Sequence, residues 1–306
     1  MTNKPNPQRG LLLSLAAYIW WGFLPVYLKA VSVFPAVEYF AHRIMWSALL
    51  LTVIMTLRKE WGPLKATLTL RKIAIFCVVS VVLCGNTLIY IWAVTHDRIV
   101  DASLGAFMNP IISVVFGVVV LRERIAAHHK LAVVIAALGI LYLGIMSQTF
   151  PWVALVLAAT WGAYGLMKKM APLNTLHGSW LEVVLASVPF LLYLLYLGNQ
   201  GQNEFTKHGL GLDLLLIASC VVTTTPLLLF TAGMRSAPLS QLGFLQYISP
   251  TMQFLLGIFL FHEPFTSTKF IGYAIVWLAL LVYMFGSGLV RWRAHTAAKL
   301  ALRAKE

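Results

Sequence analysis

The chain has 306 residues, of which 60% are apolar and only 11% are charged, and its mean hydropathy is +0.83. Soluble domains contain about 45–50% apolar and about 25% charged residues, so this composition excludes an ordinary water-soluble protein. The net charge of +13 would favour nucleic acid in a soluble chain. Here the cations lie in short segments beside apolar stretches, without a nucleic-acid-binding motif, so we predict a lipid bilayer and no nucleic acid as partner.

Ten apolar stretches of about 17–23 residues follow one another, each long enough to cross a hydrocarbon core of about 30 Å as a helix. They cover 10–29, 36–57, 72–93, 100–121, 130–147, 150–167, 177–197, 212–232, 239–261 and 270–290. The predicted fold is therefore an all-α integral membrane protein with ten transmembrane helices.

Six identities recur at a fixed offset of 140 residues. They pair Trp21 with Trp161, Gly22 with Gly162, Lys29 with Lys169, Pro110 with Pro250, Gly117 with Gly257, and Glu123 with Glu263. We interpret them as two copies of one five-helix unit, 1–148 and 149–290, followed by a basic cytoplasmic tail, 291–306. An odd number of spans forces the second copy to enter from the opposite side. The result is a pair of inverted repeats with a site between the halves, as in secondary transporters.

The basic residues are distributed unequally over the loops. If the amino terminus is cytoplasmic, 18 of the 23 Lys and Arg residues fall on the cytoplasmic side. This is the positive-inside pattern, and it places both termini in the cytoplasm. An even number of helices is then required, which ten satisfies.

One predicted span, 36–57, carries three ionisable residues, Glu38, His42 and Arg43. A charge at the bilayer centre costs about 2.5–3.5 kcal/mol on insertion scales unless it is paired or faces water. Glu38 and His42 share a helix face, and Arg43 is rotated by about 100°. They could form the wall of a cavity, with Arg43 holding an anionic substrate group or Glu38, and with Glu38 or His42 exchanging protons. The alternative is a local ion pair that snorkels to the outer headgroups.

Glu182 is the corresponding acidic residue of the second copy, although it does not obey the fixed offset. Inverted repeats would place Glu38 toward the outer mouth and Glu182 toward the inner mouth of one central cavity, as candidates for proton coupling. The alternative is a carboxylate stabilised by the positive end of its own helix.

Two predicted spans contain a proline after a polar residue, Asn109-Pro110 and Ser249-Pro250. A proline inside a helix removes one backbone hydrogen bond, bends the helix and frees a carbonyl. Asn109, Gln246 and Ser249 are placed to use that carbonyl for a ligand or to repair the helix locally. Further bends are expected at Pro25, Pro189 and Pro226.

Aromatic residues inside the spans are candidates for contact with a flat or apolar ligand, although most such residues only pack. We include Trp20, Tyr90 and Tyr247. Asp101 is expected to be the N-cap of a helix starting at Ala102. Glu123 and Glu263 are expected to fix the turns into the following helices.

Catalytic, metal and cofactor motifs are not found. The three cysteines lie inside apolar stretches without paired spacing, so neither disulfides nor a metal site are expected. The sequence has no Walker loop, H-E-x-x-H or G-x-S-x-G motif, so we predict no cofactor, no ATP hydrolysis and no enzyme.

The spacing P-x6-G-x5-E occurs twice, from Pro110 to Glu123 and from Pro250 to Glu263, and resembles the EamA repeats of the drug/metabolite transporter superfamily. Local strings are similar to its RarD branch, bacterial inner-membrane proteins labelled chloramphenicol-sensitive or chloramphenicol-resistance permeases. These strings are Ala16-Ala17-Tyr18 with Trp21-Gly22, Glu38 with His42-Arg43, Asp101-Ala102-Ser103-Leu104-Gly105 with Asn109-Pro110, and Gly243-Phe244 with Gln246-Tyr247-Ile248 and Pro250-Thr251. The resemblance covers nearly the whole chain. It implies inverted repeats and a central cavity built mainly by the first four helices of each copy, but it leaves the substrate open.

The sequence therefore predicts an inner-membrane secondary transporter that moves small organic solutes by alternating access, as an exporter rather than an importer. A facilitative channel or a lipid-handling membrane protein is the alternative, and an intramembrane enzyme is disfavoured. Protons are a candidate coupling ion, and a homodimer is left open.

Overall fold

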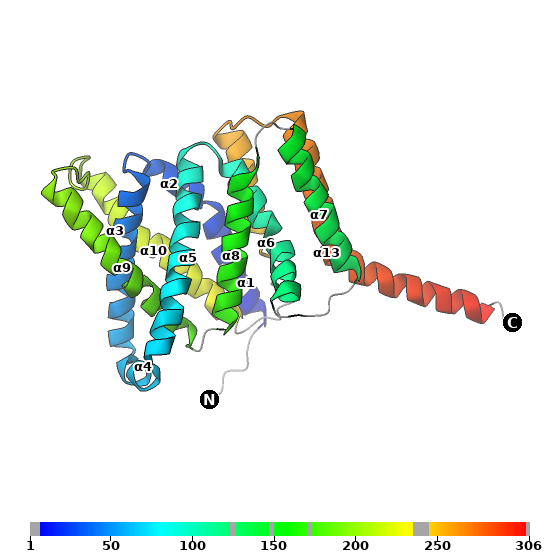
Figure 1. The fold of residues 1–306 in the computed structure, drawn as a ribbon, viewed down its shortest axis with the longest axis horizontal. Coiled ribbons are helices and arrows are strands. Elements are labelled where there is room, and N and C mark those ends of the chain that lie inside the picture. Colours follow the sequence, from blue (N-terminus) through cyan, green and yellow to red (C-terminus); the bar gives the residue numbers. More distant parts are fainter. Residues whose placement is uncertain are drawn as a thin grey trace. The chain divides into compact units, whose positions relative to one another are not determined.

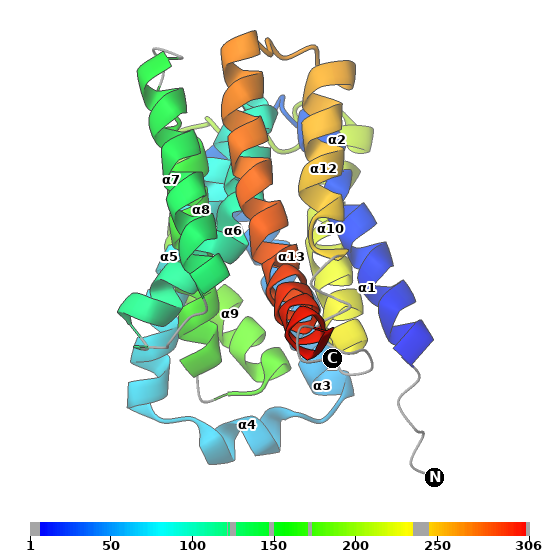
Figure 2. The same cartoon turned by 90° about the vertical axis from the view of Figure 1, so that its right-hand side faces the viewer.

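The computed structural model describes residues 7–120, 122, 127–146, 150–170, 173–234 and 245–303, and all regular structure among them is helical (Figures 1 and 2). The helices are α1 Pro7–Gly22, α2 Leu24–Ala30, α3 Ala36–Leu57, α4 Trp61–Thr67, α5 Leu70–Thr95, α6 Ile99–Val119, α7 Ala127–Met146, α8 Trp152–Met170, α9 Thr175–Asn199, α10 Leu210–Met234, α12 Ile248–Leu255 and α13 Ser267–Arg303, with a π-helix, η1, over Leu256–Leu260. Seven helical stretches of this described part are long and apolar enough to cross a membrane.

The chain forms two compact units. The first comprises Met1–Ser103 and Tyr164–Glu263, and the second comprises Leu104–Ala163 and Pro264–Glu306. Each unit contains segments of both predicted repeats. In the second unit α7 and α13 lie side by side (Figures 1 and 2). A methyl group on Gly272 would be 2.3 Å from the Leu143 side chain, so glycine permits this close approach.

The first predicted span is broken into α1 and α2 at Phe23, two residues before Pro25. Pro25 has no N–H for the Trp21 carbonyl one turn earlier, so that oxygen needs another donor. The Gln253 side-chain amide donates to it over 3.0 Å. A side chain from α12 therefore repairs the bend in the first span.

The same repair occurs in α10, where Pro226 lies inside the helix. Its missing N–H leaves the Val222 carbonyl free, and the Trp20 indole N–H donates to that oxygen over 3.0 Å. Trp20 thus has a structural role in the first unit that the sequence did not predict.

The sequence analysis placed Pro250 in the middle of a helix, and this prediction is wrong. Pro250 lies in the first turn of α12, which begins at Ile248. A proline there removes no helical hydrogen bond, because the first N–H groups of a helix have no internal partner. The break lies just before, where Gln246 and Tyr247 form a turn. Pro110 lies within α6, and its side chain is outside the described part.

The Glu263 side chain caps the amino-terminal end of α6. Its carboxylate oxygens accept hydrogen bonds from the backbone N–H groups of Ile99, at 2.6 Å, and Val100, at 2.9 Å. Gly257 makes the approach possible, because a methyl group there would be 2.7 Å from the Val100 side chain. Glu263 therefore caps a distant helix rather than the following one. This also corrects the assignment of Asp101, which lies in the first turn of α6 and not at its N-cap. Glu123, which corresponds to Glu263 in the first repeat, lies outside the described residues.

Removing this cap is expected to destabilise the protein. Glu263→Ala leaves two buried N–H groups without acceptors, and each unsatisfied group costs about 1–3 kcal/mol. Glu263→Gln retains one acceptor and should lie between alanine and the parent in a thermal unfolding series in detergent. The control is Asp97→Asn, because Asp97 forms an exposed pair with Lys29 that should contribute less than about 1 kcal/mol. Equal unfolding temperatures for the parent and Glu263→Ala would contradict the capping role.

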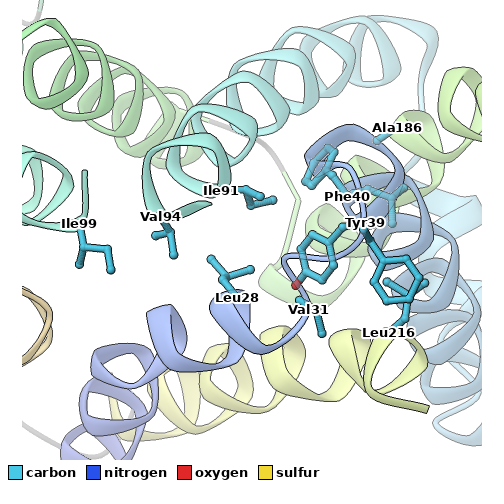
Figure 3. Close-up of a cluster of buried hydrophobic side chains, with 11 residues drawn as sticks. Leu28, Val31, Tyr39, Phe40, Ile91, Val94, Ile99, Ala186 and Leu216 are labelled. Atoms are coloured by element: carbon cyan, nitrogen blue, oxygen red, sulfur yellow. The ribbon is translucent and has the colours of Figure 1, made fainter. Parts of the chain in front are cut away.

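A cluster of buried apolar side chains holds the first unit together (Figure 3). It is formed by α2, α3 and the turn between them, by α5, α9 and α10, and by the first turn of α6. The members are Leu28, Val31, Phe34, Tyr39, Phe40, Ile44, Ile91, Val94, Ile99, Ala186 and Leu216. Because Phe40, Ile44 and Ala186 also line the cavity described below, the core and the cavity share one wall.

Candidate functional site

A cavity of about 100 Å³ lies within the first unit, bounded by α3, α5, α9, α10 and the carboxyl-terminal end of α8. It is the site where two predicted residues, Arg43 and Glu182, come together. The polar lining consists of Arg43, Ser47, Ser80, Cys84, Thr87, Tyr164, Ser179, Glu182, Thr223 and Thr224, and the apolar lining of Phe40, Ile44, Leu51, Leu83, Val183, Ala186 and Leu227.

Glu182 is buried and fully partnered. Its Oε1 lies 2.5 Å from the Lys168 Nζ, and its Oε2 accepts a hydrogen bond of 3.2 Å from the Tyr164 hydroxyl. Ser80 donates to its backbone carbonyl over 2.8 Å. Since α9 begins at Thr175, Glu182 lies beyond the first turn, and the positive end of its own helix does not explain the buried carboxylate.

Arg43 differs from Glu182 in its surroundings. Among the residues that the structure describes, no carboxylate oxygen lies within 4.0 Å of its guanidinium and no side chain accepts a hydrogen bond from it. The ring of Phe40, 5.5 Å away, gives a cation–π contact. Such a contact contributes about 0.5–2 kcal/mol, whereas a charged residue at the bilayer centre costs about 2.5–3.5 kcal/mol. The ring therefore offsets only part of the cost.

Glu38 and His42 lie away from the cavity. Glu38 Oε1 accepts hydrogen bonds from the backbone N–H groups of Glu204, at 2.7 Å, and Phe205, at 3.3 Å. His42 Nε2 is 4.0 Å from the same oxygen, and its ring is 4.9 Å from the Phe205 ring. Both residues thus hold the segment between α9 and α10. The rotation of about 100° between adjacent helical residues turns Arg43 to the cavity instead.

The other predicted residues do not line the cavity. Ser249 accepts a hydrogen bond of 3.2 Å from Gln253, and Tyr90 packs against the apolar cluster of Figure 3. Trp20 lies on α1, Tyr90 on α5, Asn109 on α6 in the second unit and Ser249 in the first turn of α12. Gln246 and Tyr247 form the turn just before α12.

The sequence analysis missed three side chains with polar contacts in the first unit. Tyr164 and Lys168 bind Glu182, and Gln253 donates to the Trp21 carbonyl. Lys168 was counted only as a cytoplasmic cation. A short connection between the predicted spans 150–167 and 177–197 makes them antiparallel neighbours, so residues at equal distances from its centre face each other. The centre of that connection is Pro172, which is four residues from Lys168 but ten from Glu182, so this spacing gives no signal for the pair. Among the described residues, no group of His, Cys, Asp and Glu could hold a metal ion.

Comparison with known proteins places the chain in context. The model of the EamA-like transporter family matches residues 8–145 and 150–285. An uncharacterized transporter of Vibrio cholerae is 36% identical over 92% of this chain and 93% of its own length. Protein RarD of Streptomyces exfoliatus is 38% identical over 90% of this chain and 89% of its own length. One solved crystal structure has a TM-score of 0.58 at 16% identity, covering 91% of this chain and 97% of that chain, and shows a common fold.

Proposed function

Because the chain belongs to the RarD branch of the EamA-like transporter family, we propose that it is a secondary transporter of small organic solutes. The observation that carries this proposal is the cavity of the first unit, which is lined both by Glu182, a partnered carboxylate, and by Arg43, a cation that has no ion-pair partner among the described residues. We further propose export from the cytoplasm across a bacterial inner membrane, with both termini in the cytoplasm. Alternating access would expose the cavity to each side in turn.

Two glycine contacts support an arrangement of ten helices in two inverted repeats. A methyl group on Gly22 would be 2.6 Å from Met252, and one on Gly162 would be 2.8 Å from Ile112. Gly22 and Gly162 are related by the offset of 140 residues, and so are Ile112 and Met252. Each glycine therefore packs against the same position of the other copy. The two matches of the family model also support a repeated unit.

The test begins with the purified full-length protein. Metabolites and drugs that raise its unfolding temperature bind the folded state, because a ligand selective for that state stabilises it. Uptake of these solutes into proteoliposomes is then measured with and without an imposed proton gradient. Accumulation above equilibrium in the presence of the gradient supports a proton-coupled secondary transporter. Uptake that only equilibrates the solute indicates a facilitator, and the absence of uptake for every ligand would contradict transport.

A further inference from the structure

We infer that the transported solute is an organic anion whose single negative group binds the guanidinium of Arg43. This inference rests on the proposed function and adds the substrate class. It follows from three features of the first unit, which are the partners that Arg43 lacks, the charge balance of the cavity and the composition of its lining.

Arg43 faces the cavity, and no residue in the described part of the chain supplies a compensating charge. Among the described residues, the ionisable groups whose charge would act on it most are Tyr39, Cys84 and Tyr27. Unperturbed tyrosine and cysteine side chains are neutral at neutral pH, so none of the three supplies a negative charge. A guanidinium presents several donors in a planar fork, which matches the two oxygens of a carboxylate. The missing partner is therefore an anion with this geometry.

The charge balance gives the charge of that anion. Glu182 and Lys168 neutralise each other through their contact of 2.5 Å. Tyr164 occupies the second oxygen of Glu182, which leaves this carboxylate less available to Arg43. The one charge that then remains among the described residues of the site is the positive charge of Arg43. A monoanion would neutralise it, whereas a cationic solute would add a second uncompensated positive charge.

The rest of the lining indicates an organic solute rather than an inorganic ion. Leu51, Leu83, Val183 and Leu227 supply apolar surface. The hydroxyls of Ser47, Ser179 and Thr224 also line the cavity, and no described residue forms a hydrogen bond with them. Thr87 and Thr223, in contrast, donate to carbonyls of their own helices. The three unused hydroxyls can orient a small carboxylate whose apolar part lies against the leucine side chains.

Matched compounds that differ in charge test the inference. The probes are benzoate, benzamide and benzylamine, together with isovalerate, isovaleramide and isoamylamine, and inorganic phosphate serves as a separate anion. Binding is measured by calorimetry on the full-length protein in detergent, and uptake is measured in proteoliposomes by mass spectrometry. The variants are Arg43→Gln and the control Lys29→Gln, because Lys29 is a cation outside the cavity that pairs with Asp97 at 2.6 Å.

We expect the carboxylates to bind at least about tenfold more tightly than the amides and amines, since a charge-assisted hydrogen bond replaces a weaker one. Arg43→Gln should abolish this preference, and Lys29→Gln should retain it. Binding of the amides or amines that equals or exceeds carboxylate binding would overturn the inference, and so would carboxylate binding that Arg43→Gln leaves unchanged. Binding of phosphate alone would also overturn it. Uptake of amides or amines would leave the proposed function intact, whereas no uptake of any compound would count against both.

Discussion

Replacing Arg43 by alanine is expected to lower solute uptake by about 10- to 100-fold, the loss of one charge-assisted interaction with the solute. The fold should not suffer, because no described residue forms an ion pair with Arg43. When the Arg43 charge is removed, no described carboxylate loses an ion-pair partner. We therefore expect the unfolding temperature of Arg43→Ala to equal or exceed that of the parent, with normal amounts in the membrane.

The conservative variant separates charge from geometry. Arg43→Lys keeps the positive charge but lacks the planar fork, so it should restore only a small part of the uptake. Initial rates in proteoliposomes at equal protein content provide the measurement, and Lys29→Ala is the matched control. A clear fall in unfolding temperature for Arg43→Ala would show that the guanidinium has a structural partner. Near-normal uptake by this variant would remove Arg43 from the solute site.

The all-helical membrane fold could be predicted because the apolar stretches are long and charged residues are few. The stretch 36–57 coincides with α3, and the stretch 72–93 lies within α5. Breaks were harder to place. The sequence shows that Pro250 interrupts a helical pattern, but α12 starts only two residues before it and leaves the proline in the first turn. A proline is compatible both with a bend inside a helix and with its first turn, so its position in the sequence does not distinguish the two.

The candidate site could be predicted only in part. Arg43 and Glu182 were found because an ionisable residue in an apolar span is costly and needs a reason. Glu38 and His42 satisfied the same criterion, yet Glu38 accepts hydrogen bonds from backbone N–H groups of the segment between α9 and α10, and His42 lies against the Phe205 ring of that segment. Backbone N–H groups leave no signal in a sequence. For the same reason the capping role of Glu263 could not be derived, since its partners are main-chain atoms of Ile99 and Val100.

The pair of Glu182 with Lys168 is expected to give the second large effect. Glu182→Gln leaves Lys168 without its carboxylate, and breaking a buried pair by removing one partner costs about 3–5 kcal/mol. The Lys168 side chain is 24% exposed, so we expect the low end of this range. The neutral double variant Glu182→Gln with Lys168→Met has no unpaired charge and should regain most of the stability. Thermal unfolding of the parent, both single variants and the double variant measures this coupling.

Transport by the same variants decides whether the pair only holds α8 and α9 together or also couples transport to protons. A coupling carboxylate must change its charge during the cycle, and glutamine cannot. If Glu182 has this role, the double variant should be stable and should exchange solute across proteoliposomes, yet fail to accumulate solute when a proton gradient is imposed. Accumulation by the double variant at the rate of the parent would limit the pair to a structural role. The coupling group would then lie elsewhere, and Glu38→Gln would be the next variant to measure because Glu38 is another buried carboxylate within a predicted span.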